Sequence, residues 1–131
     1  MTMQDRATLA TFKTLRRVAG VSVTINRGVS TGTVVAVPGD TLVDRQDEDG
    51  GTVRAKVRDY IVLRSDFEGV VGAGEKPIRG DKFVEVVADY TRTFETIELA
   101  GEIFRWWDKG GQVLRIHTVE AEKVTTTTGG A

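Results

Sequence analysis

The sequence contains no cysteine and a single histidine, His117, among its 131 residues. Without cysteine the chain has no disulfides, no thiolate nucleophile and no cysteine-based zinc site, which is compatible with a reducing compartment. No second histidine exists to complete a metal shell around His117, and Ser22, Ser30 and Ser65 lie in no recognisable nucleophile elbow. We therefore expect no catalytic residue, no metal and no other cofactor.

An excess of charge is also missing, because 18 Lys and Arg against 19 Asp and Glu give a net charge of -1. Such a balance disfavours unaided binding of nucleic acid. The first thirteen residues contain both acid and base and no apolar run of signal-peptide length, so nothing there marks the chain for secretion or membrane insertion. The length fits one domain with a single core, which we expect over residues 1–124, followed by a flexible tail at 125–131.

The periodicity of apolar residues predicts one short helix followed by strands. The helix spans about residues 4–19 and ends at Gly20. From Val21 the period changes to two, which predicts a first strand with one inward and one outward face. Further strands are expected at residues 31–37, 53–63, 82–88, 93–99, 103–107 and 112–121. A helix and about seven short strands with glycine-bearing turns predict a mainly β protein, a small β-barrel or sandwich.

Two polar segments are predicted as connections. Residues 38–52, PGDTLVDRQDEDGGT, begin with a Pro-Gly-Asp break and predict a long acidic loop. Residues 67–81 are rich in glycine and predict a surface connection. Neither segment is a ligand loop: Glu75 stands where a phosphate loop needs lysine, and residues 45–56 lack the carboxylates that begin and end a calcium loop.

The segment from residue 102 to residue 120 predicts a hairpin, with Asp-Lys-Gly-Gly at its turn. Trp106 and Trp107 are adjacent and so point to opposite faces of a strand. Trp106 has the parity of Phe104, which predicts a core position for Trp106, whereas Trp107 lies with Arg105 on the other face. In this interpretation Trp106→Ala threatens folding and Trp107→Ala leaves the protomer folded.

The second strand of this hairpin places Arg115 and His117 opposite the face expected to be core, which predicts a surface or interface histidine. Arg105, Trp107, Arg115 and His117 then form one exposed face. That face could stack bases or bind a protein. We favour a protein interface, because Trp and Arg are enriched at interface hot spots and the net charge argues against nucleic acid.

The order of these signals resembles a known family. Gly80-Asp81 opens a strand, an aromatic-centred strand follows at residues 90–99, and the runs Arg105-Trp106-Trp107-Asp108 and Arg115-Ile116-His117-Thr118 close the chain. This arrangement resembles the head-tail connector proteins of tailed bacteriophages, the head-completion or stopper group. The resemblance implies a β-barrel protomer without catalytic residues. It also implies a homo-oligomeric ring beneath the portal that closes or gates the DNA-filled head and docks the tail.

In that family a long loop between strands can project into the channel of the ring, and residues 38–52 match it by position. The resemblance therefore implies channel-facing positions for Asp44, Asp47, Glu48 and Asp49. Acids there would repel DNA phosphates at short range, which suits a conduit, although a plain solvated loop fits the same residues.

The implied partners are other copies of the chain, portal or adaptor proteins, tail proteins and packaged double-stranded DNA that passes without specific binding, with no membrane. The implied location is the head-tail interface of the virion, after assembly in the host cytoplasm. The alternative is a small barrel that binds single-stranded nucleic acid through Arg105, Trp107 and Arg115. An enzyme acting through His117 ranks last.

Overall fold

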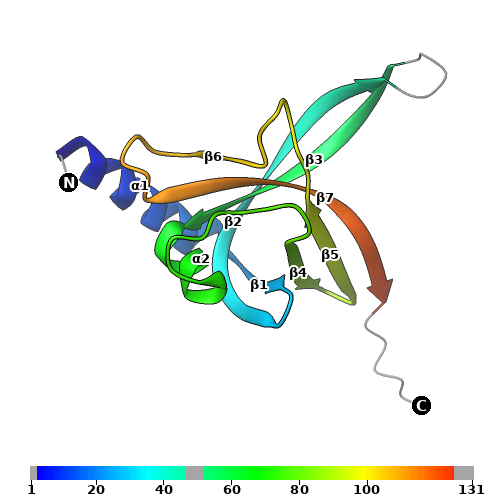
Figure 1. The fold of residues 1–131 in the computed structure, drawn as a ribbon, viewed down its shortest axis with the longest axis horizontal. Helices are drawn as coiled ribbons and strands as arrows, with labels where there is room; N and C mark the ends of the chain where they lie inside the picture. The colour runs from blue at the N-terminus through cyan, green and yellow to red at the C-terminus, as the bar shows by residue number, and fades with distance from the viewer. Residues whose placement is uncertain (1–2, 47–51, 126–131) are drawn as a thin grey trace.

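The computed structural model describes residues 3–46 and 52–125, which form a small closed β-barrel with two helices (Figure 1). The mainly β prediction is confirmed. The elements in chain order are α1 (Met3–Ala19), β1 (Val21–Arg27), β2 (Ser30–Gln46), β3 (Thr52–Leu63), α2 (Arg64–Val71), β4 (Lys82–Val87), β5 (Tyr90–Thr96), β6 (Phe104–Trp106) and β7 (Val113–Thr125).

Six antiparallel strands close the barrel in the order β3-β2-β1-β4-β5-β7, and β3 pairs with β7. The seventh strand, β6, pairs with β7 at Phe104–Trp106. β5 and β6 follow one another along the same edge of β7, since Thr96 pairs with Thr118 and Phe104 with Ile116. Residues 97–103 leave that edge between the two strands and turn at a bridge between Leu99 and Glu102. This segment is called the excursion below.

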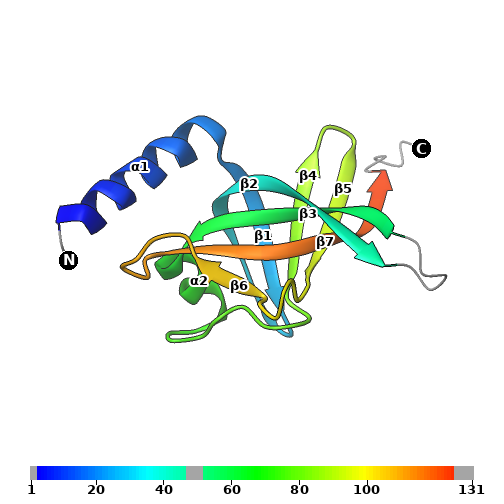
Figure 2. The same cartoon turned by 90° about the horizontal axis from the view of Figure 1, so that it is seen from above.

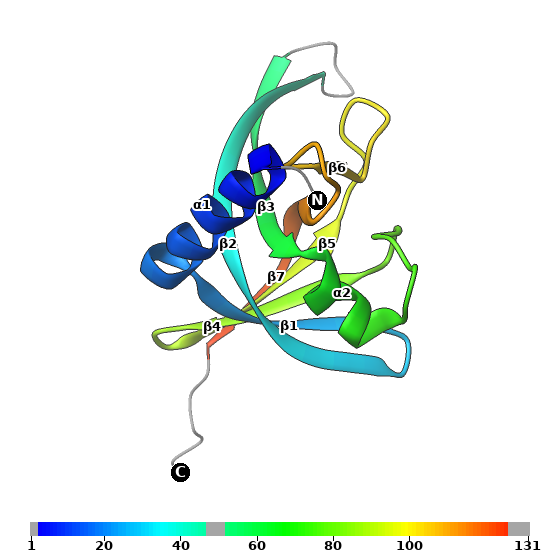
Figure 3. The ribbon, with the colours of Figure 1, turned by 90° about the vertical axis from the view of Figure 1, so that its left-hand side faces the viewer.

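Side chains fill the inside of the barrel. Alternate residues of the strands point inward, and they include Val23, Ile25, Tyr60, Phe83, Phe94 and Ile116, all at most 1 % exposed. The ring of Tyr60 stacks on Phe83 with 5.2 Å between centroids. Viewed from the side of α1, α2 lies in front of the strands (Figure 3), and its Phe67 is fully buried in the same core. The barrel is therefore a packed body with no bore.

One buried carboxylate lies inside this core. Glu85 is 2 % exposed and accepts hydrogen bonds from the Tyr60 hydroxyl and from Nε and Nη2 of Arg58, at 3.0 and 2.7 Å for the two nitrogens. Burial and the neighbouring carboxylate raise the pKa of Tyr60 above its ordinary value, so the phenol stays protonated and donates. A buried charge needs such partners, so these three side chains stabilise one another.

The prediction of a surface connection at residues 67–81 is wrong in its first part. α2 begins at Arg64 and continues to Val71 through Gly69. The helix was not predicted because glycine has a low helix propensity. It is held against the barrel by the buried Phe67. The rest of the connection is anchored by Asp81, which accepts two hydrogen bonds of 2.7 Å from Arg27 and one of 3.0 Å from the Ile78 amide.

The predicted break at Pro38 is also wrong. β2 continues through Pro38, which pairs with Tyr60 of β3, and ends at Gln46. β1 accompanies β2 only as far as Ala36, so beyond that residue β2 has an open edge where the missing N–H of a proline is tolerated. Residues 38–46 and Thr52 thus belong to strands instead of a loop, and residues 47–51 lie outside the described part of the chain.

The end of the chain differs from the prediction by a few residues. β7 extends to Thr125, which pairs with Tyr90 and was expected in the flexible tail. The remaining tail, residues 126–131, lies outside the described residues. α1 matches the predicted helix to within one residue at its start.

Candidate assembly surfaces

A two-stranded hairpin extends beyond the barrel. Residues 41–46 of β2 pair with residues 52–57 of β3, from Thr41 with Val57 to Gln46 with Thr52. In the described pairings neither segment has a third strand beside it, because β1 leaves β2 at Ala36 and β7 leaves β3 at Arg58. Figures 1 and 2 show the hairpin projecting from the barrel. We call these paired residues the arm. A hairpin alone is marginally stable in water, so a partner would stabilise it.

The four acids expected to face a channel belong to this part of the chain. The backbone of Asp44 lies in the arm and pairs with Arg54. Asp47, Glu48 and Asp49 lie outside the described residues. Their channel-facing position therefore stays a prediction.

The structure reverses the predicted roles of the two tryptophans. Trp107 packs against the buried Phe12 of α1, with ring centroids 5.7 Å apart, and contacts a second core cluster on the outer face of the barrel. Trp106 is 38 % exposed and lies beneath Lys76, whose Nζ is 5.7 Å from the ring centroid. The reason is that α1 covers the face that holds Trp107, whereas β6 is a three-residue edge strand whose end leaves the barrel interior.

His117 is buried, so its predicted position at the surface is wrong. It is 6 % exposed, and its Nδ1 lies 2.8 Å from Oδ1 of Asp59, which is 1 % exposed. Arg115 donates from Nε to the other oxygen of Asp59 at 2.7 Å. Burial alone would raise the pKa of Asp59, but the hydrogen bonds and charges of His117 and Arg115 outweigh it and lower the pKa. Asp59 is therefore a charged anchor between β3 and β7.

The four predicted interface residues do not form one exposed face. Arg105 is exposed and bonds to Glu102 at 3.3 Å, Trp107 is half-buried on α1, and His117 is covered. A cavity of about 470 Å³ separates the excursion from the Asp59 cluster and is lined by residues that include Leu99, Arg105 and His117. In the described part of the chain, its lining contains no hydroxyl or thiol beside the His117–Asp59 pair. The pair therefore has no nucleophile to activate there.

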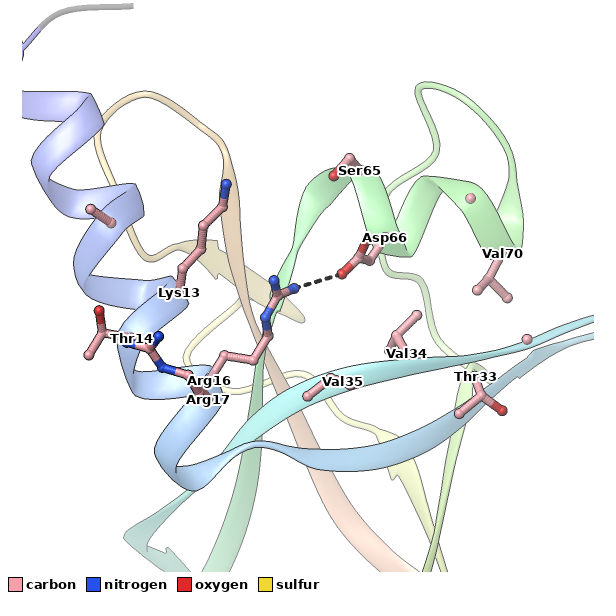
Figure 4. A pocket seen from close by; sticks show the side chains of 13 residues that line it. Lys13, Thr14, Arg16, Arg17, Thr33, Val34, Val35, Ser65, Asp66 and Val70 are labelled. Atoms are coloured by element: carbon pink, nitrogen blue, oxygen red, sulfur yellow. Dashed lines mark hydrogen bonds and ion pairs between the residues drawn. The ribbon is translucent and has the colours of Figure 1, made fainter.

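A larger cleft lies between α1, α2 and β2, and sequence reasoning missed it (Figure 4). Its volume is about 1070 Å³. Lys13, Arg16 and Arg17 line it from α1, and Asp66 lines it from α2. Arg16 reaches across to Asp66, with 3.1 Å between Nη1 and Oδ2. We call this the α1–α2 cleft.

Its floor is formed by β2 and by Val70 of α2. A Cβ atom at Gly32 would lie 2.9 Å from a methyl of Val70, so the glycine lets α2 approach the strand closely. Lys13 and Arg17 are exposed and, across residues 3–46 and 52–125, make no ion pair. The cations Lys13, Arg16 and Arg17 are close together in the sequence and could have indicated a basic surface on α1. That surface becomes one side of a cleft only because α2, which the sequence analysis did not predict, lies opposite it.

The structure is thus a filled six-stranded barrel with a projecting hairpin and a charged cleft. The match to a family model then identifies it: residues 1–125 match the phage head-tail joining protein family, and the chain belongs to that family. The resemblance in the sequence is thereby confirmed. The chain is a structural protein of the bacteriophage virion and acts where head and tail are joined.

A search of curated proteins finds no significant match. Within the described residues, no helix combines the length and the apolar character needed to cross a membrane. Those residues also hold no group of three or more side chains of the metal-binding types.

Proposed function

We propose that the chain assembles as a homo-oligomeric ring between the portal-capped head and the tail, with the DNA path running between copies. The packed interior supports this position of the path, because a six-stranded barrel filled with side chains leaves no room for a duplex. Family membership supports the joining role. The ring closes or gates the channel after the head has been filled.

The arm is the observation that carries the proposal. Its two strands form a ribbon for which the described chain supplies no third strand. Val53 and Ala55 alternate in sequence with Arg54 and Lys56, a pattern typical of a strand with one covered side. A ring supplies such cover from a neighbouring copy.

The partners are other copies of the chain, a portal or adaptor protein on the head side and a tail protein on the other. The net charge of -1 favours a conduit for DNA over a binder. Assembly takes place in the host cytoplasm, and the finished ring is part of the virion.

The test uses filled heads and free tails from a phage lacking this protein. Adding the purified chain should restore infectious particles, and electron micrographs should show a ring at the head-tail junction. A variant whose residues 42–56 are replaced by a short glycine-containing turn keeps the buried Val57 and the barrel pairings, so it should fold, but it should restore no titre. Joined particles with a single copy at the junction, or full activity without the arm, would contradict the proposal.

Binding of single-stranded nucleic acid is a distinguishable alternative. Retention of an oligonucleotide at physiological salt, abolished by Trp107→Ala, would support it. The structure gives it no specific support, since Trp107 packs on Phe12 and Arg115 bonds to Asp59.

A further inference from the structure

Two strands of the described chain separate and leave two open edges. β3 and β7 pair with one another as far as Arg58 and Thr118, and the described pairing stops there. Beyond that point β3 stays with β2 and runs into the arm, while β7 stays with β5 and ends at Thr125. Figure 1 shows the two strands diverging. In the described pairings, residues 52–57 of β3 and residues 119–125 of β7 therefore have one neighbouring strand each. We call them the β3 edge and the β7 edge.

Both edges can bind a further strand. Unpaired backbone N–H and C=O groups along an edge form a template for another strand. Neither the β3 edge nor the β7 edge contains a proline, and each has about the usual length of a strand. The open edge of β2 differs, because it begins with Pro38, which has no N–H to donate.

The two edges carry charges of opposite sign. The β3 edge contains two cations and no acid, which gives two positive charges. The β7 edge contains two acids and one cation, which leaves one negative charge. The residues are Arg54 and Lys56 on β3, and Glu120, Glu122 and Lys123 on β7. On β2, the described part of the arm adds one acid and one base, which cancel. The β3 edge therefore attracts the β7 edge and repels a second β3 edge.

The two edges also match when the register of the β3–β7 ladder is continued past its last pair. The further pairs would be Val57 with Val119, Lys56 with Glu120, Ala55 with Ala121, and Arg54 with Glu122. Apolar pairs alternate with pairs of opposite charge, so each kind shares one face of the extended ladder. β7 has a bulge toward β5 between Glu120 and Glu122. The first two pairs precede this bulge, and the later two require it to flatten as the new strand is added.

The matching strand belongs to another copy. Within one chain, the ladder of β3 with β2 continues to Thr52, and the ladder of β7 with β5 continues to Thr125. These two ladders direct the β3 edge and the β7 edge away from each other, as Figure 1 shows. Every copy nevertheless has both edges, so the β3 edge of one copy can pair with the β7 edge of a second.

We propose that the β3 edge of one copy pairs, antiparallel, with the β7 edge of the next copy. The inference rests on the proposed ring and specifies a contact within it. Because the two edges differ, the contact is heterologous, and repetition with a fixed rotation closes a ring. The pairing also gives the arm the third strand that its own chain does not supply in the described pairings.

The first experiment exchanges the charges. Arg54→Glu with Lys56→Glu reverses the β3 edge, and Glu120→Lys with Glu122→Lys reverses the β7 edge. Each set alone should lower the yield of ring-bearing particles by about tenfold or more, while the set that combines both restores it. Failure of the combined set to restore rings, when both separate sets lose them, would overturn the proposal.

A control set tests whether net charge alone produces the effect. Lys82→Glu with Lys109→Glu changes the net charge as the β3 set does, at exposed positions outside both edges. This set should leave the yield of rings within about twofold of the wild type. Thermal melts should show that all variants fold, since the Arg92–Glu120 pair that the β7 set removes is partly exposed. An equal loss of rings in the control set would overturn the proposal.

The second experiment uses the absence of cysteine, which leaves the chain without background thiols. Ala55→Cys and Ala121→Cys place one thiol on each edge, at positions that the continued register makes opposite. In particles, a short bismaleimide should convert the double variant into a ladder of covalent multimers. In the control, Val29→Cys replaces Ala121→Cys, because Val29 is fully exposed in the β1–β2 turn. The control pair should give at least about tenfold less product.

The cross-linked products separate this contact from its alternatives. If the double variant gives only linked monomers, and a mixture of the two single variants gives no dimer, the ladder continues within one chain and the proposal is overturned. Products that stop at the dimer would show a reciprocal exchange between two copies and would also overturn it. A link from either cysteine to another virion protein would assign that edge to the other protein instead.

The outcomes also separate the contact from the ring itself. If micrographs show no ring at the head-tail junction, the proposed function fails and this inference fails with it. If rings are present but the double variant links no better than the control, this inference fails and the ring stands.

Discussion

The barrel and the arm contain the same kind of strand under opposite conditions. Each barrel strand has a neighbour on both sides, and the interior is sealed by Phe67 and by the aromatic stack of Tyr60 on Phe83. In the described pairings each arm strand has one neighbour, and both continue past the point where β1 and β7 end. The difference teaches that alternation in sequence predicts a strand but not what covers it. In the proposed ring, the strands that continue beyond their own barrel are the surface that a neighbouring copy covers.

The largest effect on stability is expected from a substitution that removes a contact in the barrel core. Phe67→Ala should lower the free energy of unfolding by about 3 to 5 kcal/mol, because it opens a cavity under α2 in a fully packed core. Urea titration followed by circular dichroism measures the change. Val29→Ala, at a fully exposed apolar position, is the control and should change it by less than about 0.5 kcal/mol. Similar losses in both would show that α2 does not seal the core.

A buried charge at the foot of the arm gives the second test. Asp59→Asn should cost about 3 kcal/mol at pH 7, because Arg115 and His117 lose their charged partner. The folded pKa of Asp59 is lowered, so its contribution is present above the unfolded value of about 4 and is lost as the pH falls through the folded value. Urea titrations of variant and wild type should therefore converge in strong acid. A difference that persists unchanged there would mean that shape, and not charge, carries the effect.

Asp66→Asn serves as the matched control for that experiment. Its ion pair with Arg16 is partly exposed, and exposed pairs contribute about 0 to 1 kcal/mol. A loss as large as that of Asp59→Asn would make the α1–α2 bridge a fold determinant instead of a wall of the cleft.

Smaller losses of stability are expected when the two tryptophans on the outside of the barrel are replaced. Trp107→Ala should lower the free energy of unfolding by about 2 kcal/mol, since the half-buried ring holds α1 through Phe12. Trp106→Ala should cost about 1 kcal/mol, because that ring is partly exposed at the end of β6. Melting temperatures of the two variants provide the measurement. The reverse order would restore the assignment expected from parity with Phe104.

The smallest effect on stability is expected in the arm. Ala55→Pro fixes the backbone and removes a donor in the arm, yet the arm can open locally while the barrel stays folded. We expect a loss below about 1 kcal/mol together with at least about a tenfold drop in joined particles. Ala36→Pro makes the same change in the barrel part of β2, where Ala36 is buried beside Val21, and should cost about 3 kcal/mol or more. Equal losses would erase the distinction between barrel and arm.

Much of the fold could be predicted from the sequence, because alternation at Val21 to Ile25 and the apolar periodicity before Gly20 report local geometry directly. The family could be predicted from motif order in the last third of the chain. The extension of β2 past Pro38 could not, because a proline stops a strand only where its N–H is needed, and that depends on where β1 ends.

The candidate site was less predictable for a related reason. Parity correctly separates Trp106 from Trp107, but it does not reveal that α1 covers the second face of the sheet. Parity also predicted an exposed His117, because it does not reveal that the excursion covers that side chain. The α1–α2 cleft depends on a helix that contains Gly69, for which local propensity is poor. Each error arose at residues whose burial depends on an element that is distant in the sequence.

The excursion between β5 and β6 has a consequence for engineering this protein. Its two ends rejoin the same edge of β7, held by backbone hydrogen bonds from Ile97 to the His117 carbonyl and from His117 to the Ile103 carbonyl. Its turn at Ala100 and Gly101, both with positive φ, is exposed and carries no barrel pairing. Added residues there lengthen a loop whose closure entropy grows slowly with length. The tip of the excursion is thus a permissive point for inserting an affinity tag or a fluorescent label into the neck of an intact virion.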